Sequence, residues 1–366
     1  MTDLWVRPGA LTNWQDKLAS RFHPELVDAP VTSSNAAALK FELKSQAAGL
    51  NGWELIQKRN DWFQETIVAQ LARRAPELDQ QPLNVFAYSY AAREIFRHAR
   101  ERGWRTVLGQ IDPGLAEERI VAKLHCNGNA NGWKPAPVDY WQLWREECEL
   151  ADVIVVNSGW SRDALTSEGI SADKICIVPL AFEPSNEARS FQRAYPKAFT
   201  SDRPLRILFL GQINLRKGVR PLLDAIRLLA NEPVEFWFVG PQQIPVPADL
   251  CDNARVKWFG AAPRNNVDRF YRNADVFILP TLSDGFGLTQ LEAQSWKLPV
   301  IASRHCGAVV QHKRNGLVLE EVSAATIAAA IVDLRHAPER LAEMSQLSYV
   351  RDEFRLSSLA SSLSQL

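Results

Sequence analysis

The sequence lacks the features that mark disulfide-rich, membrane-spanning or nucleic-acid-binding proteins. Its five cysteines are scattered, odd in number and never spaced as C-x-x-C, which argues against a disulfide framework or a zinc site. No stretch approaches about 18 consecutive apolar residues, the length that spans a bilayer. The 42 basic residues match the 42 acidic ones, so no excess of positive charge would draw the protein to nucleic acid.

The start of the chain, MTDLWVRPGALTNW, has no basic segment followed by an apolar one, as a secretory signal would. Together with unpaired thiols, this predicts a cytoplasmic protein. A predicted helix at 91–103 is rich in arginine, which suits contact with an anionic membrane surface or a phosphorylated acceptor, or a solvated face. The interspersed Glu94 and Glu101 favour the solvated face. Peripheral contact with the inner face of the membrane stays open.

Apolar runs alternate with helical segments from residue 83 onward. The strand-like runs lie at 83–89, 105–110, 152–158, 174–180, 206–211, 234–240, 255–260, 275–280, 298–303 and 316–320. The predicted helices lie at 36–75, 91–103, 138–151, 160–169, 218–230, 267–274 and 288–296. Because the apolar runs are too continuous for a sheet with one wet face, the alternation predicts buried parallel sheets built from βα units.

A chain of 366 residues is too long for one ordinary core. Residues 184–204 interrupt the alternation with prolines and mixed polar residues, and we interpret them as a connection between two domains. The predicted organisation is an N-terminal Rossmann-like domain (1–190), a C-terminal one (191–345) and a C-terminal helix (346–366) that packs back toward the first domain. Ligands in such folds bind outside the carboxyl ends of the strands, so we expect the site in the cleft between the domains.

The loop GQINLRKGV (211–219) leads from a buried strand into a helix, with Arg216 and Lys217 before its second glycine. Free backbone N–H groups at a helix start, the helix dipole and two cations favour an anion. A charged hydrogen bond there contributes about 1.5–3 kcal/mol. Taken alone, the pattern is better explained by a solvated turn with a glycine hinge.

A second strand–turn–helix segment is SDGFGLTQLEAQSW (283–296). Gly285 and Gly287 allow the backbone to approach a ligand closely. The amides of Leu288 and Thr289 would point at an anion. This segment therefore also suits a ligand that carries a phosphate.

Two acids flank the glycines of this segment. Glu292, one turn into the helix, would repel a phosphate that it touched, so it suits the ribose hydroxyls of a nucleotide. Asp284, at the strand end, would accept hydrogen bonds from the hydroxyls of a sugar. The structural alternative makes Asp284 a loop acid and Glu292 a partner of the helix dipole.

Two such anion sites in one α/β domain, one with cations and one with paired acids, suit a nucleoside-diphosphate sugar. The run from Asp284 to Glu292, followed by LPVIAS, resembles the signature of the retaining GT-B glycosyltransferases of glycosyltransferase family 4 (glycosyl transferases group 1). The loop 211–219 resembles the donor phosphate loop of that family. Residues 147–184 resemble the segment that closes its N-terminal domain. The resemblance extends over about residues 83–350, and its motifs are specific in combination.

The resemblance implies the GT-B fold: two Rossmann-like, doubly wound parallel-sheet α/β domains facing a cleft, the N-terminal one for the acceptor and the C-terminal one for the nucleotide-sugar donor. It implies retaining transfer of a sugar to an acceptor hydroxyl, in bacterial glycan or glycolipid synthesis. No cofactor and no metal are implied, in agreement with the absence of a D-x-D motif or a His/Cys cluster. The acceptor stays open between a glycan, a lipid-linked saccharide and a small molecule.

The resemblance also implies site residues. Lys217 would act on the donor diphosphate and Asp284 on the transferred sugar, both in catalysis, while Glu292 would hold the ribose. The other expected substrate-binding residues are Gly211, Gln212, Arg216, Gly260, Phe286, Gly287, Leu288 and Thr289. Among them, the amides of residues 287–289 would face the phosphate or the sugar, and Gly260 would lie near the base.

The sequence departs from the family pattern at three places. Gln212 stands where the family has an arginine, whose charge Arg216 would replace. Asp284 stands in place of a longer glutamate. No histidine stands directly after the strand-like run that ends at Gln110, where the sequence reads IDPG. Asp112 is the remaining catalytic candidate there, although an Asp-Pro-Gly turn explains it equally well.

Other functions stay open. A nucleotide-sugar epimerase or a phosphorylase can use the same two-domain fold, and such an epimerase would release nucleotide without an acceptor. A non-catalytic sugar-nucleotide-binding protein would bind donor without turnover. A dinucleotide oxidoreductase is disfavoured because no G-x-G-x-x-G follows a predicted strand.

Overall fold

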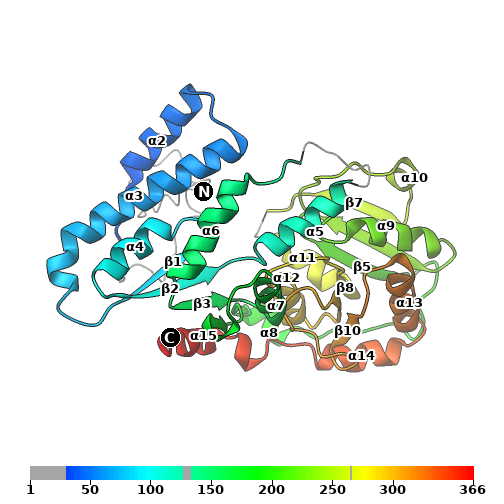
Figure 1. The fold of residues 1–366 in the computed structure, drawn as a ribbon. Coiled ribbons are helices and arrows are strands. Elements are labelled where there is room, and N and C mark those ends of the chain that lie inside the picture. The colour runs from blue at the N-terminus through cyan, green and yellow to red at the C-terminus, as the bar shows by residue number, and fades with distance from the viewer. Residues whose placement is uncertain (1–29, 127–132, 264–265) are drawn as a thin grey trace. The chain divides into compact units, whose positions relative to one another are not determined.

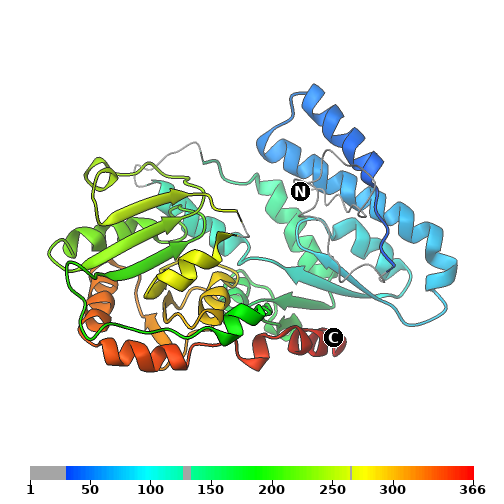
Figure 2. The ribbon, with the colours of Figure 1, turned by 180° about the vertical axis from the view of Figure 1, so that it is seen from behind.

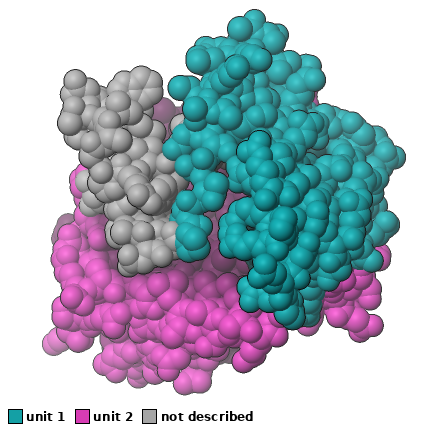
Figure 3. Space-filling view, turned by 90° about the vertical axis from the view of Figure 1, so that its left-hand side faces the viewer, with its two compact units in different colours: residues 1–106, 136–150 teal, residues 107–135, 151–366 magenta. Residues whose placement is uncertain are grey.

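The computed structural model describes residues 30–126, 133–263 and 266–366. The chain divides into two compact units, residues 1–106 with 136–150 and residues 107–135 with 151–366 (Figure 3). The expected lack of a secretory signal concerns residues 1–29, which lie outside the described part. The predicted domain boundaries differ from this division and stay a prediction.

The first unit is mostly helical (Figure 1). Its elements are α2 (Asn35–Ala47), α3 (Gly52–Leu78), β1 (Asn84–Tyr88), α4 (Arg93–Glu101), the start of β2 (Arg105–Gln110) and α6 (Val138–Leu150). Helix α4 packs against both α3 and α6, and it buries Phe96 while α6 buries Trp144. Large apolar side chains buried between these helices therefore hold the unit together.

The second unit begins within β2 and contains two groups of parallel strands. The first group comprises β2, β3 (Val153–Val156) and β4 (Ile175–Ile177), and the whole four-stranded sheet has the order β1-β2-β3-β4. Helices α5 (Leu115–Cys126) and α7 (Gly159–Ser167) connect these strands and contact each other. Leu359 of α15 (Leu356–Ser364) packs against Val107 of β2, Val155 of β3 and Val178, which directly follows β4.

The second group is a six-stranded parallel sheet whose strands lie side by side (Figures 1 and 2). Its strands are β5 (Leu205–Leu210), β6 (Val234–Val239), β7 (Val256–Gly260), β8 (Val276–Leu279), β9 (Val300–Ser303) and β10 (Gly316–Leu319). The associated helices are α8 (Asn186–Ser190), α9 (Val219–Leu228), α10 (Ala248–Cys251), α11 (Asp268–Asn273), α12 (Thr289–Ser295), α13 (Ala324–Arg335) and α14 (Pro338–Gln346).

Alternate residues of strands β5, β6, β8 and β9 enter separate cores on the two faces of this sheet. Ile207 and Phe209 of β5 belong to the core that includes α9 and α13. Leu208, between them, belongs to the core that includes α11 and α12. Successive side chains of a strand point to opposite faces, so both faces are apolar and helices cover both.

The strands lie in the order β10-β9-β8-β5-β6-β7, so successive strands of the chain are added first on one side of β5 and then on the other. From β5 the chain moves outward to β6 and β7, and then returns to β8 on the other side of β5. Ile207 pairs with Phe236 of β6 and with Val276 of β8. The carboxyl ends of β5 and β8 therefore form the topological switch point, where doubly wound sheets bind ligands.

The predicted α/β class with two parallel, Rossmann-like sheets is confirmed. Every strand-like run of the sequence forms a strand. Helices α5, α10, α13 and α14 were not predicted. The proposed connection at 184–204 contains the short helix α8. In the described residues, no helix has both the length and the apolar content needed to cross a bilayer.

Glu147 of α6 caps the first turn of α4. Its carboxylate oxygens accept hydrogen bonds from the backbone amides of Tyr90 (2.6 Å), Ala92 (2.8 Å) and Arg93 (3.3 Å). The residue is 2% exposed, and this burial raises the pKa of Glu147 to about 7, because desolvation disfavours the charged form.

We expect this carboxyl to make the protein less stable as the pH rises from about 4.5 to about 7. In that window the folded protein holds a proton that the unfolded chain has released. The contribution of Glu147 to the free energy of unfolding is therefore complete below about pH 4.5 and is lost as the pH rises to about 7. The loss is at most about 3 kcal/mol. Glu147→Gln should flatten this part of the pH dependence of the melting temperature. Parallel pH profiles for the two proteins would contradict the prediction.

Candidate active site

A cavity of about 360 Å³ lies at the switch point of the six-stranded sheet. Phe209 and Leu210 at the end of β5 and Leu279 at the end of β8 form part of its lining. The predicted site residues that line it are Gly211, Gln212, Arg216, Lys217, Asp284, Phe286, Gly287, Leu288 and Thr289. Glu292, Gly260 and Asp112 are not among its lining residues.

The loop 211–219, which carries Arg216 and Lys217, packs closely against Pro280, the residue that follows β8. Gly218 has a φ of 70°, and a Cβ there would lie 1.8 Å from the carbonyl oxygen of Pro280. The side chain of Asn214 accepts a hydrogen bond from the backbone amide of Lys217 (3.0 Å). The backbone of this loop is thus fixed by contacts within it and with the neighbouring strand, which places both cations at the cavity.

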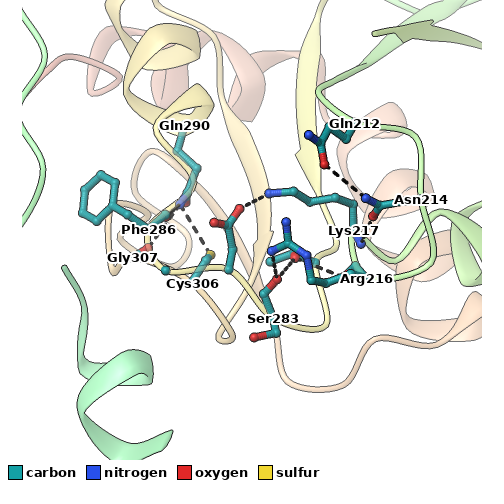
Figure 4. A network of polar contacts seen from close by, with 12 residues as sticks. Gln212, Asn214, Arg216, Lys217, Ser283, Phe286, Gln290, Cys306 and Gly307 are labelled. Carbon is teal, nitrogen blue, oxygen red and sulfur yellow. Dashed lines mark hydrogen bonds and ion pairs between the residues drawn. The ribbon is translucent and has the colours of Figure 1, made fainter. Parts of the chain in front are cut away.

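Lys217 forms an ion pair with Asp284, and Figure 4 shows its side chain extended along the site. Each side chain is 15% exposed. The structure therefore brings together the two residues that the sequence assigns to the diphosphate and to the sugar. Charges removed from water need a partner of opposite sign, and each supplies it for the other.

Arg216 lies beside Lys217 and points to the adjacent loop (Figure 4). Its Nη1 donates hydrogen bonds to the backbone oxygen of Ser283 (2.9 Å) and to Oε2 of Glu117 (3.4 Å). Its own backbone oxygen accepts from the amide of Leu282 (2.8 Å). The loops after β5 and β8 are thereby joined through both the backbone and the side chain of one residue.

A chain of hydrogen bonds beside this loop joins Glu117, Ser283 and Trp160, none of which was a predicted site residue. The Ser283 hydroxyl donates to Oε2 of Glu117 (2.7 Å), and Nε1 of Trp160 donates to the Ser283 oxygen (3.1 Å). Burial raises the pKa of Glu117, while nearby Arg216 and the Ser283 hydrogen bond oppose that rise. The apolar spacing of Ile120 and Leu124 could have revealed the helix that carries Glu117.

The turn around Phe286 is shaped by packing within the protein. A Cβ on Gly285 would lie 2.6 Å from the backbone oxygen of Ile111, so this glycine permits a close approach to the chain itself. Gly287 has a φ of 76°, which favours glycine. Phe286 is buried and packs against Phe354. The turn therefore combines a packed core residue with backbone that lines the cavity.

Glu292 lies in α12 with its side chain directed to α11. Its Oε2 accepts a hydrogen bond from the hydroxyl of Tyr271 (2.6 Å). Burial, with Glu292 as a second cause, raises the pKa of Tyr271 well above its usual range, so Tyr271 stays a donor that fixes the Glu292 carboxylate. The expected contact of Glu292 with ribose stays a prediction.

Two other predicted residues serve local structure. The Gln212 side chain is exposed, and its oxygen accepts from Asn214 (3.3 Å). Oδ1 of Asp112 accepts from Nε2 of Gln110 (3.0 Å) and from the amide of Gly114 (2.9 Å). The Asp-Pro-Gly turn is therefore present, and a catalytic role of Asp112 stays a prediction.

The base-binding and metal expectations also stay predictions. Gly260 ends β7 with a φ of 68°, at the same edge of the sheet as the cavity but outside its lining. The described residues contain no group of three or more His, Cys, Asp or Glu side chains arranged to hold a metal ion.

Residues 204–336 match the family model described as glycosyl transferases group 1. The predicted resemblance is confirmed. The amylovoran biosynthesis glycosyltransferase AmsK of Erwinia amylovora is 26% identical over 46% of this chain and 44% of its own length. A GDP-mannose-dependent phosphatidylinositol monomannoside mannosyltransferase of Mycolicibacterium smegmatis is 28% identical over 65% of this chain and 66% of its own. The chain thus spans between about half and two thirds of these relatives.

Solved structures share the fold over most of the chain. HepE of Anabaena was crystallised in complex with UDP. Its structure matches 82% of this chain and 82% of its own, with a TM-score of 0.60 and 17% sequence identity. Sucrose-phosphate synthase of Thermosynechococcus elongatus covers 86% of this chain and 79% of its own, with a TM-score of 0.63 and 18% identity. The predicted GT-B fold is confirmed by these likenesses.

The close packing of Gly218 against the backbone of Pro280 can be tested with Gly218→Ala. The matched control is Gly169→Ala, because Gly169 has a φ of 86° but open space where a Cβ would lie. The control should cost about 1–2 kcal/mol for the left-handed backbone alone. Gly218→Ala adds an overlap with Pro280 and should lower the melting temperature at least twice as much. Equal shifts in the two variants would refute the close packing.

Proposed function

We propose that this protein is a retaining glycosyltransferase that moves a sugar from a nucleoside-diphosphate sugar to an acceptor hydroxyl. One observation carries the proposal: Arg216 and Lys217 line a cavity at the topological switch point of a sheet whose segment, 204–336, matches glycosyl transferases group 1. Nucleotides bind at such places in doubly wound folds. The cations supply the charge that a diphosphate requires.

The named relatives support the donor class. HepE has been crystallised with UDP and with UDP-glucose, and the M. smegmatis mannosyltransferase is named as dependent on GDP-mannose. The bases and sugars named for these two proteins differ, so the proposal concerns the class of donor, a sugar linked to a nucleoside diphosphate.

The Lys217–Asp284 pair suggests how the donor would be held. A diphosphate in the cavity would become the partner of Lys217 in place of Asp284. The Asp284 carboxylate, at the end of β8, would then accept hydrogen bonds from hydroxyls of the sugar. Exchange between two anionic partners keeps the buried ammonium compensated throughout.

The chemistry would rest on stabilising the departing phosphate. As the bond between sugar and phosphate breaks, the sugar gains oxocarbenium character and negative charge grows on the leaving diphosphate. Lys217 and Arg216 would stabilise that charge at positions fixed in advance. A phosphate oxygen would accept the proton of the attacking hydroxyl on the same face of the sugar, so that configuration is retained without a protein nucleophile or a metal.

The biological role that we propose is bacterial glycan or glycolipid synthesis, in keeping with the name of AmsK. The acceptor would be a glycan, a lipid-linked saccharide or a small molecule. The reaction would take place in the cytoplasm, or at the inner face of the membrane through peripheral contact.

The proposal is tested by a thermal-shift screen of UDP-, GDP-, ADP- and dTDP-sugars, followed by mass analysis with candidate acceptors. A sugar-linked acceptor with retained configuration is the expected product. Release of nucleotide without any acceptor would indicate an epimerase instead. Binding without turnover across the acceptors would indicate a sugar-nucleotide-binding protein.

Lys217→Met should lower the rate of sugar transfer by about 10²–10³-fold, the loss typical of removing one group that stabilises developing charge. Lys257→Met is the matched control, because Lys257 pairs with Glu235 on β6 and its side chain is 45% exposed. The control should transfer at the wild-type rate. Full activity of Lys217→Met, with both variants folded by their melting curves, would contradict the assignment.

A further inference from the structure

Glu117 is a largely buried carboxyl beside the cavity, and the proposed transfer chemistry gives it no role. It lies in the first turn of α5, and its side chain is 16% exposed. The contacts of its Oε2 are with the hydroxyl of Ser283 at 2.7 Å and with Nη1 of Arg216 at 3.4 Å. It therefore contacts the loops after both β5 and β8.

Arg216 is shared between this carboxyl and the cavity. The residue lines the cavity, and its guanidinium is anchored by Glu117 and by the backbone oxygen of Ser283. An arginine side chain carries about 2 kcal/mol of rotamer entropy. Anchors on two different segments reduce that freedom before a ligand arrives, which is how a positioning residue assists binding.

Several charged groups face Glu117 from the segments around it. Arg216 faces it from the loop after β5, Asp284 from the loop after β8, and Asp112 from the turn before α5. On the remaining side, Trp160 of α7 contributes an N–H bonded to the Ser283 oxygen rather than a charge. Burial, the largest cause, and the two aspartates raise the pKa of Glu117, while Arg216 and the Ser283 hydrogen bond lower it. Arg216 is therefore the cation that favours the ionised form of this carboxyl.

We propose that Glu117 is a positioning residue that holds Arg216 at the cavity and takes up a proton when the diphosphate of a nucleotide-sugar becomes the partner of that guanidinium. This inference rests on the proposed function. The proton comes from solvent, and no covalent bond changes.

The proton uptake follows from charge. The two phosphate groups of a nucleotide-sugar bring two negative charges next to Arg216 and draw its positive charge away from Glu117. An ionised Glu117 would then be a largely buried carboxylate beside added negative charge, which favours its neutral form. As a neutral acid it still accepts a hydrogen bond through its carbonyl oxygen, so Arg216 remains held.

The test measures proton uptake on binding. Its probe is the nucleotide-sugar that gives the largest thermal shift, because its diphosphate has no terminal phosphate titrating near pH 6. Calorimetric titrations in two buffers of different ionisation enthalpy, repeated between about pH 5 and 8, give the protons bound per ligand. The wild type should take up a fraction of one proton, and its affinity should fall with rising pH, by at most about tenfold per pH unit.

Three variants separate charge from position. Glu117→Gln keeps an acceptor but cannot titrate, so its affinity should be independent of pH and match that of the wild type at the acidic end. Glu117→Ala loses the anchor of Arg216 and should bind more weakly than Glu117→Gln at every pH. Glu118→Gln removes the next acid of the same helix and should behave as the wild type.

The outcomes are distinct. Proton uptake that persists in Glu117→Gln overturns the assignment of the proton, and equal affinities of the Gln and Ala variants overturn the positioning role. Wild-type binding without proton uptake refutes this inference while leaving the proposed function intact. Failure of the wild type to bind any nucleotide-sugar refutes both.

Discussion

The site depends on the adjacency of β5 and β8 in the six-stranded sheet. Because these strands are parallel neighbours, the loops that follow them leave the same edge and must pack against each other. The packing is close: the amide of Leu282 donates to the backbone oxygen of Arg216, and Gly218 leaves no room for a side chain beside Pro280. Cations of one loop therefore meet acceptors of the other, and the cavity lies where they meet.

Partial burial then sets the charge balance at this edge. The side chains of Lys217 and Asp284 are each 15% exposed, and those of Arg216 and Glu117 are 24% and 16% exposed. Shielded charges are costly without partners, and here each cation has a carboxylate. A diphosphate would disturb this balance at both cations. Under the proposed function Asp284 would exchange Lys217 for sugar hydroxyls, whereas Glu117 would keep its contacts with Ser283 and Arg216, so the two carboxyls would respond in different ways.

The sequence was sufficient for the sheet but not for every side chain at its edge. Continuous apolar runs predict each strand, and because carboxyl ends of parallel strands share an edge, the meeting of Lys217 with Asp284 could be anticipated. The bond between Ser283 and Glu117 joins positions 166 residues apart, and no local pattern encodes it. Gly285 illustrates a second limit: its small size suggested a nearby ligand, yet the backbone oxygen of Ile111 occupies that space.

The turn before α5 connects these observations. Gln110 is buried and donates to Asp112, whose carboxylate also accepts from the amide of Gly114, and α5 begins at the next residue. The same turn places the backbone oxygen of Ile111 against Gly285. Asp112 therefore fixes the start of the helix that presents Glu117 to Arg216. The turn before α5 and the cavity are therefore parts of one arrangement, linked through the position of α5.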